Sequence, residues 1–257
     1  MAAVGGTVYI FGGRDQEHKE LNELYSFDTS TGTWALLSSG ANGPPHRSYH
    51  SMVADAVGCR VYVFGGCGDA SRLNDLWGYD VAAGRWEQLP SPGEACRPRG
   101  GPGLAVAGGK LWVVYGFGGE ELDDVHCYDP ATGQWSAVET TGDKPSPRSV
   151  FCATGIAGGG GGGGGTLSCS AARWTPATWA TSAPASFRPR RSPWTRRPAR
   201  GHAWTTSPGP STTRGPRGWC AFAAGEKDGR RGLLVYGGNS PTNDWLDDIY
   251  FFAPTAC

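Results

Sequence analysis

The chain of 257 residues carries 23 basic and 23 acidic side chains, and this zero net charge favours neither nucleic acid nor a membrane as a partner. The first residues lack the basic and apolar parts of a secretory signal, and no apolar run reaches the roughly 18 residues that span a membrane. We therefore expect a cytoplasmic location, with a nuclear one left open. The 42 glycines and 11 tryptophans favour short strands, tight turns and aromatic contacts between sheets.

The first predicted element is an apolar strand that ends in two glycines, and this pattern recurs along the chain. The copies are VYIFGG at 8–13, VYVFGG at 61–66, a loosened LWVVYG at 111–116 and LLVYGG at 233–238. Such a run is typical of a strand buried on both faces, and the glycines allow a sharp exit and a close approach by a neighbouring sheet. We therefore expect each run to be the inner strand of its sheet.

A polar loop and a second strand follow each glycine pair. The second strands are LNELYSFD at 21–28, LNDLWGYD at 73–80, LDDVHCYD at 122–129 and LDDIYFF at 246–252. A Gly-x-Trp sequence follows in the first three units, and the tryptophans Trp34, Trp86 and Trp135 are 52 and 49 residues apart. This spacing is close to the ~50-residue period of kelch repeats, whose sheets stack as blades. We expect each tryptophan to pack across two blades.

These repeats predict an all-β fold, a kelch β-propeller with three clear blades and a C-terminal one. We assign kelch blades to residues 1–157 and a final kelch blade to residues 217–257. No strand is predicted before Val8–Phe11, so we expect the propeller to be truncated at its N-terminus, unless the C-terminal segment supplies the closure. The segment 158–216 interrupts the blades.

Segment 158–216 differs from the rest of the chain in composition. It opens with eight glycines, and residues 166–216 hold eight arginines and four tryptophans but no acidic residue and no lysine. One interpretation is an arginine- and proline-rich linker that binds nucleic acid or carries a nuclear signal. A second is a frame slip or mispredicted splice, because such composition is typical of a GC-rich coding strand read in the wrong frame. We favour the second and expect this segment to be disordered or out of frame.

The cysteines contain no C-x-x-C pair, so the spacing does not predict a zinc ribbon. We expect scattered reduced thiols, as is typical of a cytosolic protein. The eight cysteines are at positions 59, 67, 96, 127, 152, 169, 220 and 257.

Several sequences outside the kelch consensus resemble the plant nitrile-specifier and epithiospecifier (thiocyanate-forming) proteins. They are GGRD at 12–15, RSYHSMVAD at 47–55, RGGPGL at 99–104, VVYGF at 113–117, DDVH at 123–126, VET at 138–140, PRSVF at 147–151, RGW at 217–219 and GGNSPTND at 237–244. The resemblance covers roughly residues 4–156 and 216–252. It implies a protein that directs the breakdown of a glucosinolate aglucone towards a nitrile, an epithionitrile or a thiocyanate, with ferrous iron.

The resemblance also implies substrate-binding residues. Arg14 and Arg72 match arginines that hold the sulfate of the substrate, a role that suits the two-pronged guanidinium group. Tyr49 stands where the family has an aromatic residue, and Trp219 matches a pocket tryptophan. Structural roles remain open for these residues, since Arg14 could bond neighbouring carbonyl groups and Trp219 could pack between blades.

The iron site is where this chain departs from the family. The resemblance implies a Glu-x-x-x-Asp-x-x-x-His loop between the third blade and Arg217, a ligand set that suits ferrous iron. That part of the chain has no Glu or Asp, and His202 alone cannot hold iron. We therefore expect Fe(II) from the family but not its ligands here, and leave open whether the chain is an enzyme. The alternative is a non-catalytic kelch module that binds a protein partner rather than a small-molecule aglucone.

Overall fold

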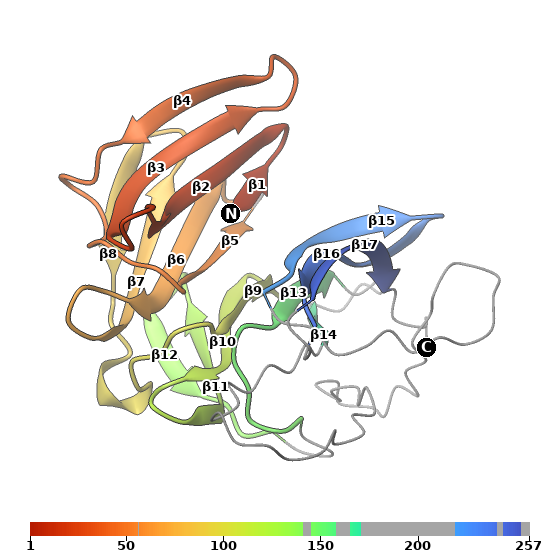
Figure 1. The fold of residues 1–257 in the computed structure, drawn as a ribbon. Helices are drawn as coiled ribbons and strands as arrows, with labels where there is room; N and C mark the ends of the chain where they lie inside the picture. Colours follow the sequence, from red (N-terminus) through yellow and green to blue (C-terminus); the bar gives the residue numbers. More distant parts are fainter. Residues whose placement is uncertain (56, 141–144, 158–164, 171–218, 241–243, 253–257) are drawn as a thin grey trace.

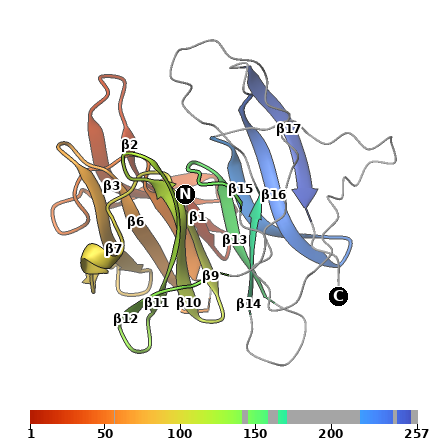
Figure 2. The ribbon, with the colours of Figure 1, turned by 90° about the horizontal axis from the view of Figure 1, so that it is seen from below.

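The computed structural model describes residues 1–55, 57–140, 145–157, 165–170, 219–240 and 244–252. These residues form five antiparallel sheets and one short 3-10 helix, Gly93–Ala95. The sheets follow one another in chain order (Figures 1 and 2), and neighbouring sheets meet through their first strands. The predicted all-β propeller is therefore confirmed.

The first three blades are complete four-stranded sheets (Figure 1). Blade 1 contains β1 (Ala2–Val4), β2 (Thr7–Arg14), β3 (Glu20–Asp28) and β4 (Thr33–Ser38). Blade 2 contains β5 (Ser51–Asp55), β6 (Arg60–Cys67), β7 (Arg72–Asp80) and β8 (Arg85–Leu89). Blade 3 contains β9 (Gly103–Ala107), β10 (Lys110–Phe117), β11 (Glu121–Asp129) and β12 (Gln134–Ala137).

The remaining strands form two smaller sheets. A two-stranded sheet pairs β13 (Cys152–Ala157) with β14 (Gly165–Ser170). The last blade contains β15 (Ala221–Lys227), β16 (Arg230–Asn239) and β17 (Trp245–Phe252). Strand β14 lies within the segment 158–216 that the composition sets apart, whereas residues 171–216 of that segment lie outside the described residues.

The first strand of each blade is where the sequence prediction was wrong. Strand β1 precedes Val8 and pairs with β2, with Ala2 opposite Tyr9 and Val4 opposite Thr7. The apolar runs that end in glycine are thus the second strands of their sheets, and the inner strands are the short ones before them. These inner strands escaped prediction because close approach between blades favours small side chains there. At Gly103, for example, a Cβ atom would lie 2.8 Å from the Phe151 ring.

The tryptophan prediction is confirmed for two of the three repeats. The ring of Trp86 packs against Phe11 of blade 1 at 5.2 Å between centroids, and that of Trp135 packs against Phe64 of blade 2 at 5.8 Å. Trp34 instead contacts Phe27 of its own blade, and 59% of its surface is exposed. Each of these two half-buried tryptophans therefore covers the apolar face of the preceding blade.

The glycine pairs lie where one blade approaches the next. Gly12 has φ +58°, and a Cβ atom on it would lie 2.8 Å from the carbonyl oxygen of Arg47. Gly65 has φ +63° and would place a Cβ at the same distance from the carbonyl oxygen of Arg99. Only glycine adopts this left-handed conformation without strain, and only a residue without a Cβ atom fits so close to the carbonyl oxygen. In the loosened third copy, Tyr115 occupies this position and keeps the left-handed backbone at φ +57°.

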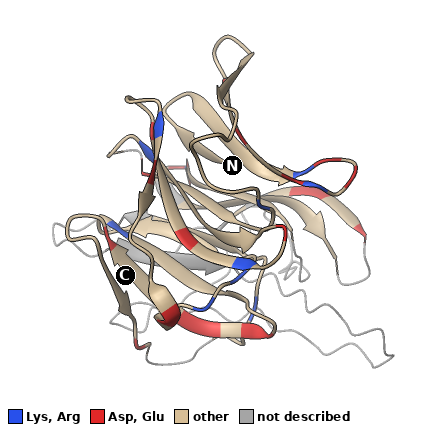
Figure 3. Cartoon of the chain, turned by 90° about the vertical axis from the view of Figure 1, so that its left-hand side faces the viewer, with Lys and Arg blue, Asp and Glu red and all other residues tan. Residues whose placement is uncertain are grey.

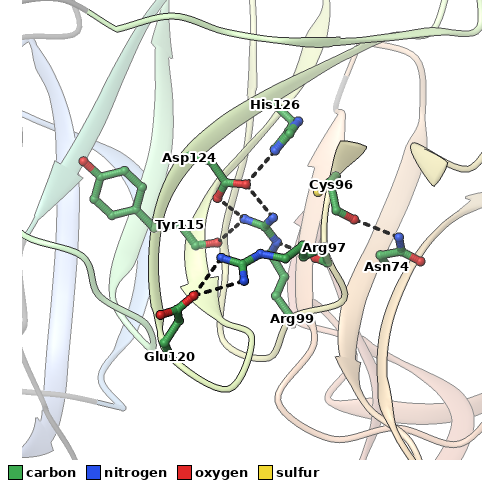
Figure 4. A network of polar contacts seen from close by, with 8 residues as sticks. All are labelled: Asn74, Cys96, Arg97, Arg99, Tyr115, Glu120, Asp124 and His126. Atoms are coloured by element: carbon green, nitrogen blue, oxygen red, sulfur yellow. Dashed lines mark hydrogen bonds and ion pairs between the residues drawn. The ribbon is translucent and has the colours of Figure 1, made fainter. Parts of the chain in front are cut away.

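Two buried arginines join neighbouring blades, and we call them the inter-blade arginines. The backbone of Arg47 bonds Leu21 and Gly13 of blade 1, while its guanidinium donates two hydrogen bonds of 2.8 Å to Asp75 of blade 2. Arg99 repeats this arrangement one blade later, with its guanidinium on Asp124 at 2.6 and 2.8 Å (Figure 4). Both guanidinium groups are fully buried. They therefore hold each pair of blades through paired charges rather than through apolar contact alone.

Charged side chains are distributed over several blades. Basic and acidic residues are interspersed on the strands and loops (Figure 3), and pairs such as Lys110–Asp129 and Arg60–Asp80 connect neighbouring strands. Among the described residues, no helix is long and apolar enough to cross a membrane.

Candidate functional site

A repeated loop conformation builds one end of the propeller. An Arg-Ser or Arg-Gly dipeptide precedes the first strand of a blade, and the residue after it has a left-handed backbone. These residues are Tyr49 (φ +52°), Gly101 (φ +57°), Val150 (φ +53°) and Trp219 (φ +52°). Left-handed backbone is costly for residues other than glycine, so the surrounding contacts must hold it in place. The amide of Gly101 donates to the carbonyl of Tyr49 at 2.7 Å, and the amide of Val150 donates to the carbonyl of Gly101 at 2.8 Å.

Two of these residues, Tyr49 and Trp219, line the same cavity of about 620 Å³. The other lining residues come from the last blade and are Ala221, Tyr236, Gly237, Gly238, Asn239, Trp245 and Leu246. The fold thus brings together two predicted site residues that are 170 positions apart in the chain. The hollow is open to solvent, and its mostly apolar lining with a few polar groups suits the apolar part of a small ligand.

Arg14 lies beside this cavity, at the end of β2. Its guanidinium carbon is 5.5 Å from the centre of the Tyr49 ring, within range of a cation–π contact. Its Nε donates to Glu20 at 2.8 Å, and Glu20 also accepts a hydrogen bond from Ser48 at 3.1 Å. The hydrogen bond with Arg14 lowers the pKa of Glu20 and raises that of Arg14. Arg14 is therefore held by both a carboxylate and an aromatic face.

Arg72, at the start of β7, has a different environment. Its guanidinium carbon lies 4.8 Å from the centre of the Phe117 ring. Its Nε atom is buried without a hydrogen-bond partner, and within the described part of the chain the side chain forms no ion pair. A buried donor without a partner is costly, and an anionic ligand would satisfy it.

Cys67 lies between the two arginines. It pairs with Arg72 across β6 and β7, and the positive charges of Arg72 and Arg14 both act on its thiol. Burial is the larger effect and raises the pKa of Cys67 above its ordinary value. Gly100 brings this strand end close to the cavity, since a Cβ on Gly100 would lie 3.2 Å from the Cys67 sulfur and 3.6 Å from the Tyr49 Cβ. Arg14, Tyr49 and Arg72 therefore gather at one end of the propeller, which we call the mouth.

Several mouth residues were missed by sequence reasoning, although the repeat contained the signal. The residue after each glycine pair, or after Tyr115–Gly116 in blade 3, occupies an equivalent place, and so does the residue that opens the facing strand. The cross-strand pairs are Arg14–Glu20 in blade 1, Cys67–Arg72 in blade 2, Phe117–Glu121 in blade 3 and Asn239–Trp245 in the last blade. Once Arg14 and Arg72 are singled out, alignment of the repeats points to the other members.

The described residues do not fit an iron site. Among them, no group of three or more His, Cys, Asp or Glu side chains is placed to hold a metal ion. The mouth carboxylates are engaged elsewhere, because Glu20 bonds Arg14 and Ser48, and Glu121 accepts a hydrogen bond from Ser149. Most of the segment where the family resemblance implies the iron loop lies outside the described residues.

Comparisons with known proteins agree with the fold and extend it. Residues 1–159 match a family model described as the KLHDC2/KLHL20/DRC7 kelch-repeats domain. The chain is 36% identical to "N-(sulfonatooxy)prop-2-enimidothioate sulfolyase" of Thlaspi arvense, over 98% of this chain and 76% of that protein. It is also 33% identical to "Acyl-CoA-binding domain-containing protein 4" of Arabidopsis thaliana, over 45% of this chain but 17% of that protein. With mouse "Kelch domain-containing protein 1" it shares 31% identity over 34% of the chain and 22% of the relative.

Proposed function

We propose, since the chain belongs to the kelch-repeat proteins of the plant nitrile-specifier and epithiospecifier family, that its mouth binds the sulfated aglucone of a glucosinolate. The bound aglucone would then break down towards a nitrile rather than an isothiocyanate. The name of the Thlaspi arvense relative describes a lyase that acts on a sulfonatooxy compound, which is the same chemical class.

The observation that carries this proposal is the environment of Arg72. Its guanidinium is held over Phe117 with a buried Nε that lacks a partner, so it offers an unneutralised positive charge at the mouth. A sulfate group presents several oxygen atoms to such a fork, and charge-assisted hydrogen bonds of this kind are the strong ones. Arg14 would contribute a second positive charge, although Glu20 partly neutralises it.

The cavity supports the proposal from the apolar side of the substrate. An aglucone carries its variable side chain opposite the sulfate, and the aromatic rings of Tyr49, Trp219 and Trp245 provide an apolar surface for it. Because Arg14 lies against Tyr49, the charged and apolar parts of the site are adjacent. Binding there would orient the sulfate as the leaving group and cover part of the exposed aromatic surface with the side chain of the aglucone.

Ferrous iron has no ligand set among the described residues, so no step of this proposal passes through it. What the chain's own residues supply is charge for the sulfate and an apolar surface for the side chain. Assays with and without added Fe(II) are therefore part of the test.

The test measures nitrile and isothiocyanate from a glucosinolate and myrosinase, with the purified chain and with its R72Q variant. We expect the unaltered chain to raise the nitrile fraction above that of the protein-free reaction. With R72Q this increase should be at least ~10-fold smaller, because one charge-assisted contact is worth roughly 1.5–3 kcal/mol. The matched control is R97Q, since Arg97 pairs with Glu120 on the surface at 3.0 Å. A nitrile fraction equal to that of the protein-free reaction, or one unchanged in R72Q, would contradict the proposal.

A second function, a kelch module that binds a protein, is favoured by the exposed aromatic residues of the last blade. Trp245 is 91% exposed and Tyr236 is 52% exposed, and aromatic residues of this kind often dominate protein interfaces. The nitrile assay separates the two functions, since an interaction module would leave the product ratio unchanged.

A further inference from the structure

The fold brings together two cysteines that the sequence shows as unrelated. Cys152 is the first residue of β13, and Cys220 immediately precedes β15. Their sulfur atoms lie 3.0 Å apart, although the residues are 68 positions apart in the chain. Cys152 is 1% exposed, whereas Cys220 is half-buried. The sequence analysis, which expected the cysteines to be scattered, therefore missed the proximity of Cys152 and Cys220.

The repeat architecture, rather than one side-chain placement, sets this proximity. Each first strand begins with a residue that meets the loop before the next blade. In this place the hydroxyl of Ser51 donates to the carbonyl oxygen of Pro102, and Gly103 lies against the ring of Phe151. Cys152 follows the arginine of its loop at the same spacing as Ser51 and Gly103, and Cys220 follows its arginine at the same spacing as Pro102 and Phe151. The two cysteines are therefore the equivalent pair at the next boundary between sheets.

The surrounding core confirms that the two sheets are direct neighbours. Cys152 packs in one apolar cluster with Leu233 and Val235 of the last blade, and Cys220 lies against that cluster. The contact between the sulfur atoms is thus part of a packed boundary between β13 and the last blade.

We propose that Cys152 and Cys220 are a redox-responsive pair that forms a reversible disulfide and ties the last blade to β13. The oxidant would be a small-molecule disulfide. The half-buried Cys220, as a thiolate, would attack one of its sulfur atoms and release the other half as a thiol. The Cys152 thiolate would then attack the Cys220 sulfur, forming the protein disulfide and releasing the second thiol. Two electrons and two protons pass from the cysteines to the small-molecule disulfide, which is thereby reduced.

Such a bond would act on the mouth as well as on the blade boundary. Cys220 follows Trp219, whose left-handed backbone places it on the wall of the cavity. A covalent bond at Cys220 would fix the chain beside this tryptophan and close the loop between residues 152 and 220. Because long loops lose most conformational freedom on closure, the oxidised form should be clearly more stable than the reduced one.

Two of the other described cysteines provide internal controls. Cys59 is exposed, and Cys96 is fully buried with its thiol pKa raised to about 11 by burial, so neither resembles the pair. Cys169 and Cys257 have no described side chains and must be followed in the same experiment.

The test equilibrates the folded chain in buffers of oxidised and reduced glutathione, blocks free thiols and maps disulfide-linked peptides by mass spectrometry. We expect a single dominant link between Cys152 and Cys220 that dithiothreitol reverses. The oxidised chain should unfold at a temperature higher by about 5 °C or more. The C220S variant should lose both the link and the shift, while the C59S variant keeps them.

The mapping on the unaltered chain keeps the proposal falsifiable even if C220S fails to fold. A link that forms only in urea, a dominant link through Cys169 or Cys257, or only mixed disulfides with glutathione would each overturn the proposal. None of these outcomes depends on nitrile formation, so the proposed function stands or falls separately.

Discussion

At the scale of single residues, the inter-blade arginines show how buried charge is accommodated in this fold. Burial alone raises the pKa of Asp124, but hydrogen bonds from Arg99 and His126 outweigh that effect and leave the pKa well below its ordinary value. Arg99 also donates to the carbonyl oxygen of Tyr115 at 3.0 Å (Figure 4). The guanidinium is thus satisfied only while Asp124 is ionised and in place.

The D124N variant tests this arrangement. It removes the charge that balances the fully buried Arg99, and we expect it to lower the free energy of unfolding by roughly 1–3 kcal/mol, because the buried guanidinium loses its charged partner while the 37% exposure of the Asp124 side chain lets water replace part of that partner. The measurement is the free energy of unfolding from urea titrations. The matched control is E120Q, whose partner Arg97 is on the surface, and it should change stability far less. Equal losses of stability in the two variants would show that the Arg99–Asp124 pair stabilises the chain no more than a surface pair does.

At the scale of strands and turns, the parts predicted from the sequence were those with a strong pattern. The apolar runs, the glycine pairs and the Gly-x-Trp turns are easy to recognise because they contain large or unusual residues. The apolar runs correctly predicted the strands β2, β6, β10 and β16. The first strands were missed because Ala2–Val4 and its counterparts are short and rich in small residues. Their position depends on neighbouring blades, which no local pattern records.

The G65A variant tests why the glycine pairs recur. A methyl group there would lie 2.8 Å from the Arg99 carbonyl oxygen and would also require a left-handed backbone. Gly84 has the same φ of +63°, but its nearest atom, the Tyr79 hydroxyl, lies 3.9 Å away. We expect G84A to cost roughly 1 kcal/mol and G65A at least about twice that, measured by thermal unfolding. Similar losses would show that only backbone conformation, not blade contact, requires the glycine.

At the scale of the whole molecule, the candidate site depends on which blades become neighbours. The family resemblance pointed to Arg14, Tyr49, Arg72 and Trp219, and the fold places Tyr49 and Trp219 on one cavity. Local spacing could not have joined them, because the last blade returns to the mouth only through the propeller arrangement. For the same reason, Glu20 became evident as the partner of Arg14 only from the register of β2 and β3, and Phe117 as the partner of Arg72 only from the contact between blades 2 and 3.

Blade-to-blade packing predicts unequal effects for equivalent tryptophans. Trp86 fills the space between blades 1 and 2, in contact with both Phe11 and Tyr79, whereas Trp34 is 59% exposed. We expect W86A to lower the free energy of unfolding by about 3 kcal/mol or more, and W34A by less than half as much. Urea titrations of both variants make the comparison. If W34A proved as costly as W86A, another surface would have to cover Trp34 in solution.

The inter-blade arginines also have a mechanical consequence. The backbones of Arg47 and Arg99 are bonded to one blade while their side chains are bonded to the next, so a blade pulled away must break two charged hydrogen bonds at once. Under tension applied to the chain ends, we infer that blades 1 to 3 would detach one at a time rather than unravel continuously. The extension would then rise in separate steps, with each rupture force set by the apolar packing between two blades together with one arginine and its carboxylate.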